Sequence, residues 1–318
     1  MNQIMTKCCV IGGAGFIGSH LVVDLQKSGR SVTVVGRREV PIRRLPDSVK
    51  YISGDYSDTY FLEQILGDHD EVILLAYTTV PKTSYDDPVK DLLTNVPYEV
   101  AFFELASKLA LKKIVFVSSG GTIYGKPVFL PISEDHPTNP ISPYGITKLT
   151  IEKYAFMYHV SKGLPVVCVR PGNAYGEGQR PFTGQGFIAT AINSILQNKE
   201  ILLFGDEGTV RDYIHVHDIV SGIMAVLTGG LSGECYNVGT GRGSNNYEIL
   251  QILSPLAEAH GFTIKCSVVP SRPFDVPKNI LDSAKLRSHT GWRSVIGLEE
   301  GLQMTWNCFF DGRRRLEE

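Results

Sequence analysis

The sequence predicts an α/β protein: a doubly wound parallel sheet with helices on both faces, followed by a smaller C-terminal lobe. Short apolar runs alternate with helical patterns through the first half of the 318 residues. Such alternation is typical of a parallel sheet whose connecting helices cover both faces. Beyond about residue 175, loops rich in glycine and proline interrupt shorter elements. This change of pattern predicts the second lobe.

The first elements in the chain are a strand at Cys8–Ile11 and a helix at Phe16–Ser28. The helix is predicted because Leu21 and Leu25 recur at helical spacing on one face, and Gly29 follows as a helix-ending residue. Further short apolar runs predict strands at residues 32–35, 51–52, 72–75, 114–117 and 166–169.

Composition and charge are those of an ordinary globular protein, with 43% hydrophobic residues and 31 Lys and Arg against 33 Asp and Glu. This near-neutral balance predicts no nucleic-acid or membrane-surface partner. No apolar segment has the length of a membrane span, and the N-terminal pattern is not that of a secretory signal. The six cysteines show no CxxC spacing. We therefore expect buried thiols in a reducing cytoplasm, and no metal site.

A glycine-rich turn lies between the first strand and the first helix, with the sequence Gly-Gly-Ala-Gly-Phe-Ile-Gly over residues 12–18. Its three spaced glycines allow a tight turn, a close approach of backbone to a pyrophosphate, and close packing of helix on strand. The free N–H groups at the helix start favour phosphate. The turn thus predicts a Rossmann-like dinucleotide-binding domain over residues 1–175, to which later segments return, and a mainly substrate-binding lobe over residues 176–318. The predicted cofactor-binding residues of the turn are Gly12, Gly15, Phe16, Ile17 and Gly18.

The choice between NAD and NADP is open from the residues at the end of the second strand. An acidic side chain there binds the ribose hydroxyls of NAD, but this strand is followed by Arg37 and Arg38. Two guanidinium groups suit the 2′-phosphate of NADP, or both are solvated loop residues. Asp55, which follows the third strand, is placed to contact the adenine end in either case.

Tyr144 and Lys148 lie four residues apart at the start of a predicted helix, and hence on one helical face. A nearby ammonium group and the positive charge of a nicotinamide both lower the pKa of a phenol. We therefore predict Tyr144 as a proton acceptor near neutral pH, with Lys148 steadying the phenolate.

The glycine-rich turn and the Tyr-Gly-Ile-Thr-Lys run at residues 144–148 together resemble the extended short-chain dehydrogenase/reductase superfamily. More closely, the chain resembles the UDP-glucose 4-epimerase group of nucleotide-sugar epimerases, nearly from end to end. The further segments that carry this resemblance are Phe-Val-Ser-Ser-Gly-Gly-Thr-Ile-Tyr-Gly at 116–125, Arg-Pro-Gly-Asn at 170–173, Gly-Thr-Val-Arg-Asp-Tyr-Ile-His-Val at 208–216 and Arg-Pro-Phe-Asp at 272–275.

The resemblance implies roles for residues outside these two motifs. Ala76 and Asn95 join the predicted cofactor-binding residues. Asn173 is expected to contact the nucleotide sugar. The resemblance also places Arg211 and Arg272 on the diphosphate. The remaining predicted substrate residues are Asp275, beside Arg272, and Asn279, where the family has a pocket-gating residue. Because asparagine is fairly small, we predict that an N-acetylated UDP-hexose is tolerated. The resemblance also implies a homodimer.

The chain departs from the family pattern at Gly120, where the best-known epimerases carry Ser or Thr. Ser119 and Thr122 are the alternative sources of a hydroxyl that hydrogen-bonds the sugar. Thr79 stands where several relatives have a lysine. The Asp-Glu pair of sugar 4,6-dehydratases is absent, because Gly121 and Thr122 fill that place.

The predicted function is the epimerisation of a UDP-hexose at C4 through a 4-keto intermediate, with UDP-glucose and UDP-galactose or their N-acetylated forms as substrates. NAD or NADP is expected to stay tightly bound, because no net redox change occurs. A nucleotide-sugar reductase or dehydrogenase of the same superfamily is the first alternative. A non-catalytic dinucleotide-binding module is the second, and the intact pair of Tyr144 and Lys148 disfavours it.

Overall fold

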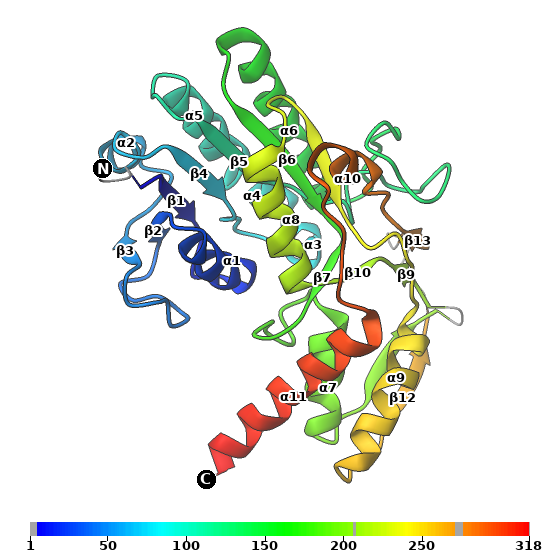
Figure 1. Ribbon diagram of the computed structural model, residues 1–318. Helices are drawn as coiled ribbons and strands as arrows, with labels where there is room; N and C mark the ends of the chain where they lie inside the picture. The colour runs from blue at the N-terminus through cyan, green and yellow to red at the C-terminus, as the bar shows by residue number, and fades with distance from the viewer. Residues whose placement is uncertain (1–4, 206–207, 271–275, 318) are drawn as a thin grey trace.

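The structure is a computed structural model, and it describes residues 5–205, 208–270 and 276–317. Seven parallel strands form the main sheet in the order β11-β6-β5-β4-β1-β2-β3 (Figure 1). Their bounds are β1 Lys7–Ile11, β2 Ser31–Gly36, β3 Lys50–Ser53, β4 Glu71–Leu74, β5 Lys113–Val117, β6 Val166–Pro171 and β11 Cys235–Val238. The predicted α/β class and the predicted strands of the first half are confirmed.

The central strands are apolar on both faces because each face packs on a layer of helices. In β1, Cys8 and Val10 point into one core, while Cys9 and Ile11 point into the other. Side chains alternate along a strand, so a strand buried on both sides needs a continuous apolar run. This is why the short apolar runs of the sequence predict strands.

Two layers of helices cover the sheet. On one face lie α1 (Phe16–Lys27), α8 (Val216–Gly229) and α10 (Ala284–Thr290), which share a core with even-numbered residues of β1 (Figure 1). The opposite face is covered by α2 (Thr59–Leu66), α5 (Val96–Ala106) and α6 (Pro143–Lys162). The two short helices α3 (Pro81–Asp86) and α4 (Pro88–Leu93) pack against α6.

A smaller group of elements, which includes the helices α7 (Phe187–Leu196), α9 (Asn246–Ala259) and α11 (Leu298–Glu317) and the strand β12 (Cys266–Val269), lies beside the main sheet (Figure 1). It has its own core around Trp306. It contains three strand pairs, all parallel. The pairs are β7 (Asn173–Tyr175) with β10 (Tyr213–His215), β8 (Ile201–Phe204) with β12, and β9 (Val210–Arg211) with β13 (Lys278–Asn279).

The second half of the chain returns to the main sheet in two places. Strand β11 pairs with β6 and extends the sheet, and α8 and α10 pack on the face that α1 also covers. The main core therefore includes residues well beyond 175, such as those of α8, β11 and α10. The smaller core is built from chain segments that lie on either side of α8 and β11 in the sequence.

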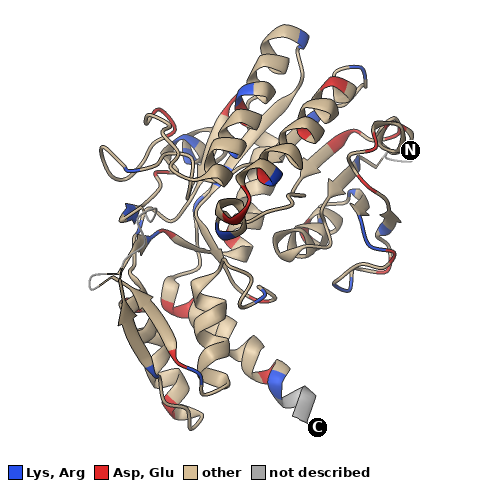
Figure 2. Cartoon of the chain, turned by 180° about the vertical axis from the view of Figure 1, so that it is seen from behind, with Lys and Arg blue, Asp and Glu red and all other residues tan. Residues whose placement is uncertain are grey.

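Charged residues of both signs are scattered over the helices and strands (Figure 2), as the net charge of −2 leads one to expect. Among the described residues, no helix is both long enough and apolar enough to cross a membrane. The six cysteines are free thiols; Cys8, Cys9 and Cys168 are buried, whereas Cys266 and Cys308 are exposed, contrary to the expectation that all are buried.

Candidate active site

The glycine-rich turn lies at the carboxyl ends of β1 and β4, where the order of strands in the sheet reverses. Ligands of doubly wound sheets bind at such switch points. Gly12 has a φ of 87°, and a Cβ there would lie 2.7 Å from the backbone nitrogen of Ala76 after β4. Only glycine therefore allows the two strand ends to lie this close.

The first turn of α1 offers its N–H groups to a ligand. The helix begins after Gly15, which has no side chain to cap it, and there is no acidic residue in the first turn. A Cβ on Gly18 would lie 2.6 Å from the Cα of Gly13. The glycine lets the helix start pack directly on the turn, so that the unpaired amides and the positive end of the helix dipole face a common point.

A groove of about 250 Å³ runs from this turn to the end of β2. Five of the predicted cofactor residues line it: Gly12, Gly15, Arg37, Arg38 and Ala76. The free amides, the glycine cradle and the elongated groove fit a dinucleotide, with pyrophosphate at the start of α1 and the adenine ribose near the arginines.

The other predicted cofactor residues do not line this groove: Phe16, Ile17, Gly18, Asp55, Asn95, Tyr144 and Lys148. Asn95 is fully buried, and its side chain accepts hydrogen bonds from the N–H and hydroxyl of Thr78 and donates one to the carbonyl of Asp91. Because Thr78 lines the groove, Asn95 acts from beneath it and not by direct contact. Asp55 is exposed and accepts the N–H of Ser57.

Sequence reasoning missed the aromatic side of the groove. Tyr51, Tyr56 and Tyr77 all line it. The hydroxyl of Tyr51 donates to the carbonyl of Arg38 at 2.7 Å, and thereby shapes the backbone after β2. Tyr51 stands on β3 in register with Val34 of β2, and this pairing between strands cannot be read from local sequence.

Tyr144 stands in the first turn of α6, where Ser142 caps the helix by accepting the N–H of Gly145. Its ring packs edge-on against Tyr77, with ring centroids 5.0 Å apart. Burial, with a smaller contribution from the carboxylate of Asp91, raises the pKa of Tyr144 above its ordinary value. The predicted lowering of this pKa involves the positive charge of a bound nicotinamide as well as Lys148, so it stays a prediction.

Lys148 is buried one turn further along α6. Its Nζ donates to the carbonyl of Val117 at 2.8 Å and lies 3.9 Å from the ring centroid of Tyr77. Its distance from the ring centroid of Tyr144 is longer, at 5.9 Å. Burial lowers the pKa of Lys148 to about 8, although the carboxylate of Glu99 acts in the opposite direction.

Glu99 is a buried acid that the sequence did not single out. It lies on α5, is 1% exposed, and neither of its carboxylate oxygens has a hydrogen-bond partner among the described residues. Burial raises its pKa to about 7, while the charge on Lys148 lowers it. Because each of the two buried groups shifts the pKa of the other, Glu99 and Lys148 together determine the net charge of this part of the site.

The turn after β5 explains why the chain has glycine at position 120. A Cβ there would lie 2.5 Å from a methyl carbon of Leu281 and 2.8 Å from the backbone oxygen of Arg170. A serine or threonine does not fit this space. Of the alternative hydroxyls, that of Thr122 is buried without a partner in the described part of the chain, whereas Ser119 is half-buried. Both hydroxyls therefore stay candidates, and that of Thr122 is the one without a partner inside the described protein.

Two predicted substrate residues lie beside this turn. Asn279 is 1% exposed, donates through Nδ2 to the carbonyl of Gly120 at 3.0 Å, and leaves its Oδ1 without a partner among the described residues. The Oδ1 of Asn173 lies 3.2 Å from the place where a Cβ on Gly121 would stand. Asn173 and Asn279, from separate parts of the sequence, thus both approach the turn at Gly120 and Gly121.

Arg211, on β9, donates through Nη1 to the carbonyls of Val210 and Val276. It therefore borders the segment that leads to β13. The predicted substrate residues Arg272 and Asp275 lie outside the described residues.

Thr79, where several relatives have a lysine, takes part in a buried hydrogen-bond cluster. It donates its hydroxyl to the carboxylate of Asp91, which also accepts the hydroxyl of Thr147.

One group of potential metal ligands was not foreseen. The Oε2 of Glu177 lies 3.3 Å from Nε2 of His215 and 3.8 Å from Nε2 of His217. The Nδ1 of His215 accepts the N–H of His217, and its Nε2 faces the carboxylate. This contact between an imidazole and a carboxylate joins the start of α8 to the loop after β7.

Comparisons with known proteins agree with this geometry. The model of the NAD dependent epimerase/dehydratase family matches residues 8–239. A putative UDP-glucose 4-epimerase of Methanocaldococcus jannaschii is 32% identical over 96% of this chain and 99% of its own. The UDP-glucose 4-epimerase of Thermotoga maritima, solved with UDP-glucose, superimposes with a TM-score of 0.91 at 33% identity, covering 97% of this chain and 100% of that one. The Thermus thermophilus UDP-glucose 4-epimerase, solved with NAD, gives 0.88 at 34% identity, covering 96% and 99%. With its turn, groove and Tyr-Lys pair in place, this chain belongs to the NAD-dependent epimerase/dehydratase family.

Proposed function

We propose that this protein interconverts UDP-hexoses by inversion at C4, with UDP-glucose and UDP-galactose as substrates. The observation that carries the proposal is the position of Tyr144. Its ring packs on Tyr77, which lines the dinucleotide groove, so the phenol lies next to a residue of the groove wall. The names of the relatives support the same reaction.

The residues of the chain divide the work of this reaction. Tyr144 accepts the proton of the C4 hydroxyl and later returns it, and Lys148 supplies the positive charge that stabilises the phenolate. The free hydroxyl of Thr122 donates to the sugar oxygen, and Asn173 holds the nucleotide sugar in place. Arg211 balances charge on the diphosphate. Residues of the groove and the start of α1 would hold a nicotinamide dinucleotide, which would supply the hydride chemistry at C4 of the sugar.

Conversion of UDP-galactose to UDP-glucose without added dinucleotide tests this proposal. Chromatography of the products should show an equilibrium mixture that is reached from either sugar. A parallel reaction with UDP-N-acetylgalactosamine tests the expectation drawn from Asn279. Stoichiometric consumption of NADPH, with a reduced sugar as product, would show a reductase instead and would overturn the proposal.

We propose that the dinucleotide is NAD, as the family description and the NAD-bound relative support. We also propose that Arg37 and Arg38 let NADP bind with an affinity comparable to that of NAD. Both side chains are exposed at the groove's end, and β2 offers no acid to repel a 2′-phosphate.

The double variant Arg37→Gln with Arg38→Gln is expected to bind NADP about tenfold or more weakly, because charge-assisted hydrogen bonds to a phosphate are lost. Its affinity for NAD should stay essentially unchanged. Calorimetric titration of the dinucleotide-free protein measures both constants. Arg44→Gln, in the same loop but outside the groove, is the control. Equal losses for the two dinucleotides would contradict this assignment.

Glu99→Gln is expected to move the alkaline limb of the activity profile to lower pH. Above its own pKa of about 7, Glu99 is an anion that raises the pKa of Lys148, which is about 8. Without this anion the lysine loses its proton at a lower pH, and the phenolate loses its stabilising charge. Rates measured from pH 6 to 10 (roughly the span of both groups) test this. The control is Glu104→Gln, which removes an exposed acid on the same helix, α5. An unchanged alkaline limb in Glu99→Gln would refute the coupling between Glu99 and Lys148.

We further propose a homodimer formed through α6. This helix exposes apolar side chains that lie along one side at helical spacing: Ile146, Tyr154, Phe156, Met157 and Val160. Light scattering is expected to give a mass of about twice the 35.0 kDa of the chain. A mass that stays at that of one chain at micromolar concentration would contradict it.

A further inference from the structure

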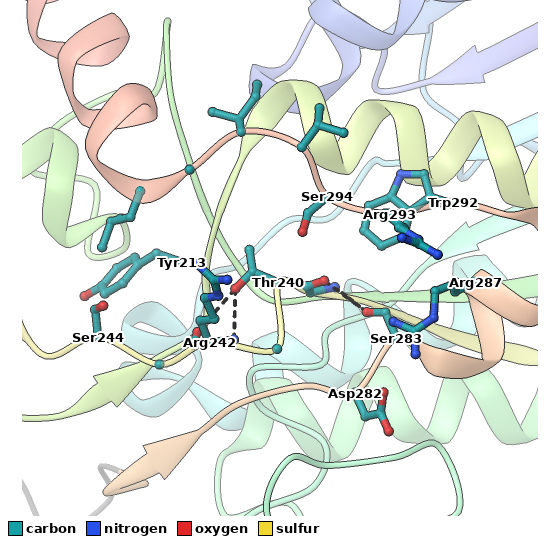
Figure 3. Close-up of a pocket in the computed structure, with 17 residues that line it drawn as sticks. Tyr213, Thr240, Arg242, Ser244, Asp282, Ser283, Arg287, Trp292, Arg293 and Ser294 are labelled. Atoms are coloured by element: carbon teal, nitrogen blue, oxygen red, sulfur yellow. Dashed lines mark hydrogen bonds between the residues drawn. The ribbon is translucent and has the colours of Figure 1, made fainter.

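A second cavity, of about 880 Å³, lies between the glycine-rich segment 239–244 and the linker 292–298 that leads into α11 (Figure 3). We call it the linker cavity. None of its lining residues belongs to the dinucleotide groove, and neither Tyr144 nor Arg211 is among them. It is therefore separate from the proposed site of the sugar reaction.

Three arginines from three different segments line the linker cavity. Figure 3 shows Arg242 on one side and Arg287 and Arg293 on the other. Within the described residues, none of the three forms an ion pair. Asp282 is the acidic side chain at the rim, and its carboxylate already accepts the N–H of Ala284. In a chain with a net charge of −2, this is a local excess of positive charge that repels itself until an anion binds.

The other lining groups narrow the kind of anion. Planar guanidinium groups bind phosphate oxygens in fork geometry, and the hydroxyls of Ser244 and Ser294 add donors. The linker contributes an apolar wall of Val295, Ile296 and Leu298, and Val295 is 80% exposed. A cavity of this size holds a molecule with both a charged and an apolar part.

We propose that the linker cavity binds a nucleoside di- or triphosphate as a second site. The phosphates lie between the arginines, and the base lies against the apolar wall of the linker.

A ligand in this cavity is placed to influence the proposed substrate site through one segment. Ser244 exchanges two backbone hydrogen bonds with Arg211, at 3.0 and 2.9 Å. The carboxylate of Asp212 accepts the N–H groups of Thr240 and Gly241. Fixing Arg242 and Ser244 therefore restrains the strand that carries Arg211. We expect occupancy to change the KM for the UDP-sugar more than kcat; this effect rests on the proposed function, whereas the binding itself does not.

Titration with ATP tests the site. The protein is first saturated with UDP-glucose, which occupies the proposed substrate site and, having no terminal phosphate, is not the kind of ligand proposed for the linker cavity. The heat of ATP binding is then measured. The chain has two tryptophans. Trp292 lines the cavity and Trp306 is buried in α11, so ATP is also expected to change the fluorescence of Trp292. This signal should disappear in Trp292→Phe.

The double variant Arg287→Gln with Arg293→Gln is expected to bind ATP at least about tenfold more weakly. Arg44→Gln with Lys108→Gln removes the same charge from exposed sites outside the cavity, and should bind ATP as the unmodified protein does. Equal weakening of ATP binding in both double variants, or no ATP binding to the protein saturated with UDP-glucose, would overturn the proposal. Inorganic pyrophosphate that binds as tightly as ATP would overturn the role of the apolar wall. A protein that binds ATP in this way but does not epimerise UDP-sugars would refute the proposed function alone.

Discussion

Replacing Tyr144 with phenylalanine is expected to lower the turnover of UDP-galactose by about 10²–10⁴-fold, the usual contribution of a positioned acid or base. The variant keeps the ring that packs on Tyr77, so the wall of the groove and the binding of the dinucleotide should be unchanged. Only the oxygen that accepts the proton of the C4 hydroxyl is removed. Rates from a coupled assay, and the dinucleotide released from denatured protein, measure the two effects separately.

Tyr154→Phe is the matched control for this experiment. Tyr154 lies on the same helix, α6, but is exposed and distant in sequence from the capped first turn. Its loss of a hydroxyl should leave turnover unaffected. Retention of full activity by Tyr144→Phe would remove this residue from the mechanism, and loss of bound dinucleotide would show that the phenol serves binding and not proton transfer.

Replacing Glu152 with glutamine is expected to lower the free energy of unfolding by about 3–5 kcal/mol, because it leaves a buried charge without its partner. Glu152 on α6 pairs with Arg170 on β6 at 2.6 Å, and their side chains are 3% and 6% exposed. Arg170 also donates to the hydroxyl of Tyr124. The pair thus joins the catalytic helix to the strand that leads to Asn173.

The matched control is Glu234→Gln. Glu234 pairs with Lys285 at the same distance, 2.6 Å, but both side chains are partly exposed. Solvent screens such a pair, and its loss is expected to cost no more than about 1 kcal/mol. Urea unfolding followed by circular dichroism compares the two variants. Equal losses would show that burial does not set the value of the Arg170 pair.

The parts of the site that were predictable from sequence are those set by local geometry. A strand, a tight turn and a helix start follow one another within a dozen residues, and the glycines at 12, 15 and 18 are needed for backbone reasons that hold in any such unit. The spacing of Tyr144 and Lys148 is likewise a property of one helix. The predicted strands match because apolar runs reflect burial on both faces of the sheet.

Long-range packing determines the remaining features, and local sequence carries no sign of it. Glu99 reads as an ordinary polar residue in the first turn of α5, yet the packing of α5 on α6 buries it near Lys148. In the sequence, Gly120 is simply a glycine where related epimerases carry Ser or Thr. In the structure, Leu281, more than 150 residues later, occupies the space that such a side chain needs. The surroundings of Tyr144 have the same origin: spacing along one helix places Lys148 nearby, but the burial and the Asp91 carboxylate that raise the pKa of the phenol come from the packing of other elements.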